Sequence, residues 1–145
     1  ILQFHMGADC ADQVAYVAER HPQLTCLVDH LGYPDLDQDP VAFEPIVALA
    51  RHANVMVKVS DVAGRSKQEF PYADVHPFIE RLYRAYGSQR LLWGTGYPGH
   101  HRLKHNWPSL ADELHLIREG IPFFEAADRD RVLGGTAAQV WGLGR

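Results

Sequence analysis

Short apolar runs alternate with longer amphipathic stretches along most of this chain. The short runs are rich in β-branched and aromatic residues, which is typical of buried strands, and they cover residues 1–5, 24–29, 54–60 and 90–95. Between and after them, apolar residues recur at helical spacing, which predicts helices over residues 9–20, 40–52, 74–87 and 107–119. A helical tail is expected from about residue 126 to 142, broken at Gly134-Gly135.

Several polar residues stand where helix caps are expected. Asp9, Asp39 and Asp74 precede the first three helices, Asp39 is followed by proline, and Thr136 follows the glycine pair of the tail. Side-chain oxygens at these positions can accept hydrogen bonds from the free N–H groups of a first helical turn. Each is therefore predicted to begin a helix.

The order of elements is β–α repeated four times and then the tail. Repeated β–α units of this length predict a parallel sheet with helices outside it, in a single domain over residues 1–145. Two arrangements of these four units are consistent with the pattern. The four units form either an open, doubly wound sheet or half of a (β/α)8 barrel, which normally needs roughly 200–250 residues. Strand order separates them, because a reversal in the middle would exclude the half barrel.

Composition and charge exclude some classes of binding partner. The 145 residues are 46% apolar and 22% charged, carry a net charge of −4 and have no block of lysine and arginine, which argues against nucleic acid and anionic membranes. No run of 18 apolar residues exists, so no membrane span is expected. Cys10 and Cys26 lack metal-site or redox spacing and suggest a reducing, cytoplasmic location. The chain opens directly on a strand without an initiator methionine, so we expect residues before it.

The chemistry of parallel α/β proteins gathers at the carboxyl ends of their strands. Here those ends carry His5, His30, Ser60 and Gly96 in order. A lone histidine at a strand end is more often structural than a ligand. Two at consecutive ends favour a metal or substrate site, because neutral imidazole is a common metal ligand and acid–base group.

Four segments, taken in order, resemble strands five to eight of the amidohydrolase-related family of the "amidohydrolase 2" type. They are "QFH" at 3–5, "LVDHLGYP" at 27–34, "VMVKVS" at 55–60 and "RLLWGTGYP" at 90–98, and "RDRVLGGTAAQVWGL" resembles the family's last helix. That family contains TIM-barrel metal-dependent hydrolases, lactonases and decarboxylases. The resemblance covers nearly the whole chain and implies the C-terminal half of a TIM barrel.

The resemblance also implies roles. His5 and His30 match the family's histidines on strands five and six, which bind metal or substrate. Gly96 falls where the family usually has an aspartate that binds metal and takes a proton from the attacking water. Two features therefore depart from the family: position 96 has no carboxylate, and no His-x-His motif, which closes the family's first strand, occurs in these residues.

Other residues could supply the missing chemistry. The segment "GHHRLKH" holds His100, His101 and Arg102, which could overhang the barrel mouth and bind substrate, unless it is merely a solvated loop. Asp29 should point to the face opposite His30, since it precedes it on the strand. Asp61 follows Ser60 closely enough to reach inward. Both are weak candidates.

The leading hypothesis is an enzyme that opens a lactone, amide or related bond with an activated water. His5 and His30 would be catalytic or metal-binding, and Ser60, Tyr97, His100, His101 and Arg102 would bind a small-molecule substrate. The implied cofactor is a divalent metal, Zn²⁺ first, or none. The alternative is a protein that keeps the fold for binding or structure and has lost catalysis. A half barrel also exposes two sheet edges, which predicts pairing with a missing N-terminal half or self-association.

Overall fold

The four predicted strands form one parallel sheet. The computed structural model of the protein describes residues 1–38, 40–97 and 108–143. Its strands are β1 (Leu2–Phe4), β2 (Cys26–Val28), β3 (Val55–Val59) and β4 (Leu91–Trp93). They are ordered β1-β2-β3-β4, and every neighbouring pair is parallel. This order has no reversal, so the doubly wound alternative is wrong and the barrel-like order is confirmed.

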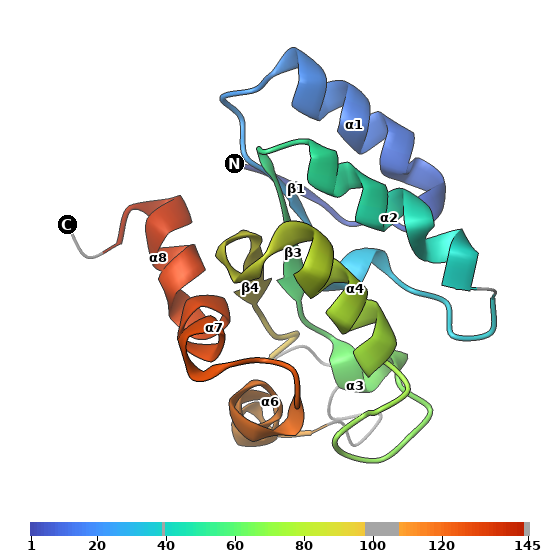
Figure 1. The fold of residues 1–145 in the computed structure, drawn as a ribbon, viewed down its shortest axis with the longest axis vertical. Helices are drawn as coiled ribbons and strands as arrows, with labels where there is room; N and C mark the ends of the chain where they lie inside the picture. Colours follow the sequence, from blue (N-terminus) through green and yellow to red (C-terminus); the bar gives the residue numbers. More distant parts are fainter. Residues whose placement is uncertain (39, 98–107, 144–145) are drawn as a thin grey trace.

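Helices return the chain between the strands. The α-helices of the described residues are α1 (Ala11–Arg20), α2 (Glu44–Ala48), α3 (Val62–Arg65), α4 (His76–Tyr86), α6 (Leu110–His115), α7 (Ala126–Asp130) and α8 (Thr136–Trp141). Short 3-10 turns lie at Ala8–Cys10, His30–Gly32, Pro40–Phe43, Leu49–Arg51 and Ser88–Arg90, and π-helical turns at Leu116–Gly120 and Arg131–Gly135. Figure 1 shows α1, α2 and α4 packed side by side along the sheet.

The predicted caps were mostly wrong. Helix α1 follows the 3-10 turn that contains Asp9, and its N-cap, Cys10, makes no side-chain cap hydrogen bond. Asp74 does not cap α4, because its carboxylate instead accepts hydrogen bonds from the Ser66 hydroxyl and the Lys67 N–H. Asp39 lies outside the described residues.

The C-terminal tail is continuous rather than broken. Residues 126–141 pass from α7 through a π-helical turn into α8 without leaving helical conformation at Gly134-Gly135. Thr136 is the first residue of α8, not its cap, and its buried hydroxyl donates to the Ser88 carbonyl at 3.0 Å. The tail is thereby tied to the turn that precedes β4.

The hydrophobic core lies between the sheet and the helices. On β3, Val55, Val57 and Val59 are fully buried and belong to this core, as does Ile79 of α4. Because side chains alternate along a strand, the opposite face of the sheet presents a second row, which is Gln3, Leu27, Met56, Lys58 and Leu92 by register. None of these five is part of the helix-side core. We call this second face the inner face.

Candidate functional site

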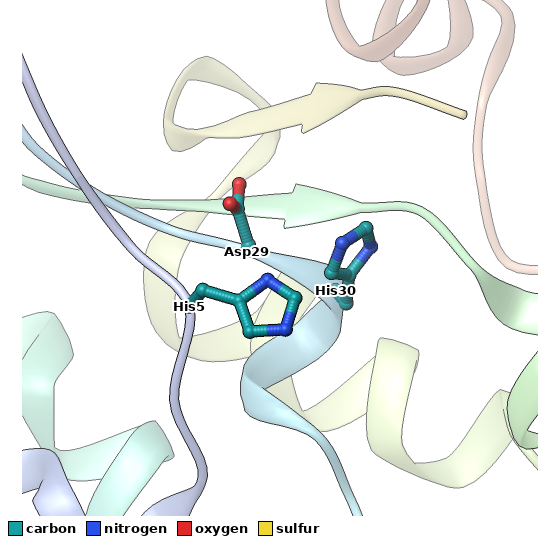
Figure 2. A group of neighbouring side chains, drawn as sticks. All are labelled: His5, Asp29 and His30. Atoms are coloured by element: carbon teal, nitrogen blue, oxygen red, sulfur yellow. The ribbon is translucent and has the colours of Figure 1, made fainter. Parts of the chain in front are cut away.

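The side chains of His5 and His30 meet at the carboxyl ends of β1 and β2. Their ring centroids are 5.3 Å apart with the planes nearly perpendicular, and Figure 2 shows both imidazoles at the ends of neighbouring strands. The two histidines expected to share a site are therefore brought together. His5 is exposed and His30 is half-buried.

The backbone after β2 turns abruptly and redirects His30. His30 and Leu31 have φ of 51° and 60°, in the left-handed region that non-glycine residues seldom adopt. The strict alternation of side chains ends at this turn. As a result, Asp29 does not point away from His30 as its position on the strand predicted. One nitrogen from each imidazole and one oxygen of Asp29 all lie within 4.8 Å of one another.

Asp29 belongs to the inner face, and Lys58 lies beside it there. The Lys58 ammonium is 2.8 Å from Oδ1 of Asp29, and both side chains are largely shielded from solvent. A charged pair this close, one strand apart, fixes the carboxylate next to the two imidazoles. The inner face therefore carries a cation as well as an anion at the strand ends.

Each imidazole has a hydroxyl partner. The Tyr33 hydroxyl lies 2.7 Å from Nε2 of His5, and the Ser60 hydroxyl lies 3.0 Å from Nδ1 of His30. Ser60 is buried, and Tyr33 packs its ring against both histidines. These contacts orient the rings without occupying the second nitrogen of His30.

Burial and nearby charges set the protonation of the site. Burial lowers the pKa of His30, against the opposing influence of the Asp61 and Asp29 carboxylates. The neutral imidazole is therefore favoured near pH 7, the form that can bind a metal or accept a proton. Burial together with the Asp61 charge raises the pKa of the Tyr33 phenol, which keeps it a hydrogen-bond donor.

The turn after β4 has an open place at position 96. A Cβ built on Gly96 would meet nothing within 4 Å among the described residues. Tyr97 is 56% exposed, and its N–H donates to the Thr95 hydroxyl. His100, His101 and Arg102 lie outside the described residues, so their predicted place over the site stays a prediction.

Sequence reasoning missed three members of this cluster: Tyr33, Lys58 and Arg65. Lys58 had a usable signal, since a charged residue inside the apolar run "VMVKVS" must face something other than the helix-side core. Tyr33 and Arg65 had none, because the left-handed turn that presents Tyr33 (φ 52°) is not visible in the pattern. Arg65 stacks on the Tyr33 ring, 5.0 Å from its centroid.

An unreversed parallel β/α sheet with two histidines at neighbouring strand ends is the arrangement of a (β/α)-barrel protein. The Amidohydrolase family model matches residues 1–143, so the chain belongs to the amidohydrolase family. The fold is the C-terminal half of a TIM barrel. Among curated proteins, the chain is 28% identical over 134 residues to the L-fucono-1,5-lactonase of Burkholderia ambifaria, an alignment that covers 88% of this chain and 45% of that protein.

Solved structures show the same partial coverage. A zinc-bound amidohydrolase from Burkholderia multivorans has a TM-score of 0.78 at 22% identity, covering 97% of this chain and 52% of its own. A Pseudomonas putida protein named a 2-pyrone-4,6-dicarboxylic acid hydrolase has a TM-score of 0.77 at 24% identity, covering 99% and 52%. These likenesses establish the fold. The chain spans about half the length of these relatives.

Proposed function

We propose that the protein containing this chain hydrolyses a small cyclic ester, such as a sugar lactone, at the carboxyl end of the barrel. The observation that carries the proposal is the meeting of His5, His30 and Asp29 at the strand ends. The kinship to a named lactonase supports the same conclusion. Water adds to the carbonyl carbon of the ring, and the bond between that carbon and the ring oxygen breaks. The product is a hydroxy acid.

The site residues divide between positioning and recognition in this proposal. His30 and His5 polarise or hold the substrate, with Ser60 and Tyr33 fixing their rings. Lys58 holds the Asp29 carboxylate in place. Beside Tyr33 and Arg65 lies a hollow of about 360 Å³ with a mainly polar lining. That volume is within the range of small-molecule sites. Tyr97, His100, His101 and Arg102 would recognise the rest of the substrate.

The donor set also suits a divalent metal. Two imidazole nitrogens and a carboxylate oxygen are the ligand types that catalytic zinc sites use. His5, His30 and Asp29 would hold such an ion, which would supply Lewis-acid polarisation of the carbonyl and of water. Asp29 has two carboxylate oxygens, so one could bind the ion while the other kept its contact with Lys58. Metal content is tested directly by elemental analysis of the purified full-length protein.

The test of the proposed site uses the full-length protein. Hydrolysis of L-fucono-1,5-lactone and related sugar 1,5-lactones is followed by proton release. We expect His30→Ala and His5→Ala to lower kcat/KM by about 100-fold or more, as removal of an acid–base or ligand group commonly does. His21→Ala, an exposed histidine at the end of α1, is the control and should retain wild-type turnover. Unchanged turnover in both site variants would remove the assignment.

A second candidate function is binding without catalysis. Its support is the missing side chain at position 96, where the family usually places its catalytic carboxylate. The open space there makes Gly96→Asp sterically acceptable. If wild-type protein lacks turnover on every sugar lactone and Gly96→Asp creates it, the natural protein is a binder on an amidohydrolase fold.

The edge of the sheet at β1 is partly exposed. Ile1 and Leu2 are 49% and 42% exposed there, whereas Leu27 and Leu92 of the inner face are 0% and 1% exposed. We propose that a complementary half barrel, or a second copy of this chain, covers the β1 edge. Among residues 1–38, 40–97 and 108–143, every helix is too short or too polar to cross a lipid bilayer.

A further inference from the structure

Asp61 occupies an unusual place at the end of β3. It directly follows Ser60, whose hydroxyl touches His30, and its side chain is only 13% exposed. Its backbone has a φ of 57°, a left-handed conformation that aspartate adopts more readily than most residues but still seldom. Asp61 lines a small hollow together with Ser60 and Gly94, which follow β3 and β4.

The carboxylate interacts with members of the site on two elements. The Arg65 Nε lies 3.3 Å from Oδ2 of Asp61, and the same guanidinium stacks on the ring of Tyr33. Among the charges near His30, that of Asp61 has the largest effect on the imidazole. The charge of Asp61 therefore acts on both the His30 imidazole and the Tyr33 phenol.

Gly64 makes room for this carboxylate. A Cβ built at position 64 would lie 2.4 Å from Oδ1 of Asp61, closer than real Cβ contacts allow. The backbone of Gly64 is helical, within α3, so no positive φ demands glycine there. The physical reason for glycine is the neighbouring carboxylate. Glycine at position 64 thus leaves free the space that the Asp61 carboxylate occupies.

We propose that Asp61 supplies the carboxylate that the turn at Gly96 lacks, acting as the general base that accepts a proton from the attacking water. The inference rests on the proposed lactone hydrolysis. The water oxygen bonds to the ring carbonyl carbon as one water proton passes to Asp61. The bond between the former carbonyl carbon and the ring oxygen then breaks, and the same proton passes from Asp61 to the leaving alkoxide. The product is the ring-opened hydroxy acid, and Asp61 is again ionised.

The surroundings favour Asp61 over the other nearby carboxylate. Asp29 is held by the Lys58 ammonium at 2.8 Å and is a candidate metal ligand, so its oxygens already have other partners. Burial raises the pKa of Asp61, with Arg65 and His30 opposing that rise and Glu113 adding to it. A carboxylate with a raised pKa is the better proton acceptor. The Arg65 contact still keeps it ionised when the substrate arrives.

The first test replaces the carboxylate in the full-length protein. Asp61→Asn keeps the shape and tolerates the left-handed backbone, so its thermal midpoint should stay close to wild type. We expect kcat on a sugar 1,5-lactone to fall by about 100-fold or more, the usual contribution of a general base. Gly96→Asp added to Asp61→Asn should restore at least about tenfold, because it returns a carboxylate to the open place at the barrel mouth.

The second test displaces the carboxylate without removing it. Gly64→Ala should lower kcat by about tenfold or more, since the new methyl group pushes Asp61 out of position. Gly134→Ala is the matched control: this helical glycine is exposed, has no atom within 4 Å of an added Cβ, and should leave kcat unchanged.

The outcomes separate the two proposals. An active wild type whose Asp61→Asn variant keeps kcat within about threefold would overturn the role of Asp61 and leave lactone hydrolysis standing. A wild-type protein without turnover on any sugar lactone would overturn both. Loss of kcat in Asp61→Asn and Gly64→Ala, with Gly134→Ala unaffected, is the result expected.

Discussion

Tyr86 illustrates how a single buried polar group holds two helices together. Its side chain is 1% exposed, and its hydroxyl donates to the Ile46 carbonyl at 2.6 Å, joining α4 to α2. The Arg90 guanidinium lies over the same ring, 5.0 Å from its centroid. Burial raises the pKa of this phenol well above its ordinary value, so it remains a donor at all working pH values.

Removal of this hydroxyl should be costly. Tyr86→Phe leaves the Ile46 carbonyl buried without its donor, and we expect a loss of about 1–3 kcal/mol in the free energy of unfolding. Urea denaturation of the full-length protein measures it. Tyr16→Phe is the control, because Tyr16 is 58% exposed and its change should stay within about 0.5 kcal/mol. Equal losses in the two variants would contradict the prediction.

Single residues also mark where sequence reasoning succeeded and failed at the site. The convergence of His5 and His30 follows from their places at the ends of consecutive strands, which the apolar runs reveal. The position of Asp29 did not follow, because the alternation rule holds only while the strand continues. The chain leaves the strand at His30 with a positive φ, and no local sequence pattern predicts that turn.

At the scale of elements, helix existence was predictable and helix beginnings were not. Amphipathic spacing located α1 and α4, whose buried residues form their inward faces. The proposed caps Asp9 and Asp74 failed because a short polar side chain binds whichever N–H groups lie nearest in the folded chain. For Asp74 those groups come from the loop at Ser66 and Lys67.

The contact between α4 and α7 predicts a pH dependence of stability. Tyr83 donates to the Asp128 carboxylate, and hydrogen bonds from Ser88 and then Tyr83 lower the pKa of Asp128. A lowered folded-state pKa gives stability that is present above the unfolded value of about 3.9 and is lost as pH falls through the folded value. On the acid side, the contact is therefore expected to weaken as pH falls below the unfolded value.

Thermal unfolding of wild type and Tyr83→Phe checks this expectation. The difference between their midpoints should be largest between about pH 5 and 7 and should shrink below about pH 4, where the carboxyl group of the unfolded chain is protonated before that of folded Asp128. The same hydrogen bond to Asp128 raises the pKa of Tyr83 to about 12, so its stabilising effect should fade again as pH rises from about 10. A difference that is constant from pH 3 to 7 would count against the contact.

At the scale of the whole molecule, the β–α rhythm was sufficient to predict the parallel sheet and its order. What the rhythm could not supply was which side chains of neighbouring strands lie side by side. The register places Lys58 beside Leu92 and Gln3 beside Leu27 on the inner face. The β–α rhythm locates the strands but does not by itself fix how they are aligned with one another.

The exposed edge at β1 gives a prediction for the isolated 145-residue chain. Unpaired N–H and C=O groups together with exposed Leu2 form a template for another strand. We expect light scattering to show dimers or larger species, and Leu2→Lys to shift them toward monomer, because charge on an edge strand opposes pairing. Val41→Lys, a charge added at an apolar residue away from the edge that is 72% exposed against 42% for Leu2, is the control. A wild-type monomer at high concentration would refute the idea.

The separation of the two sides of the sheet has a consequence for how such a protein can change. The core that the strands share with α1, α2 and α4 contains none of the inner-face residues of the four strands. Substitutions at Lys58, Asp61 or Gly96 should therefore alter reactivity while leaving the scaffold almost as stable as before. A carboxylate can in this way be lost from one strand end and gained at another without a change in the fold.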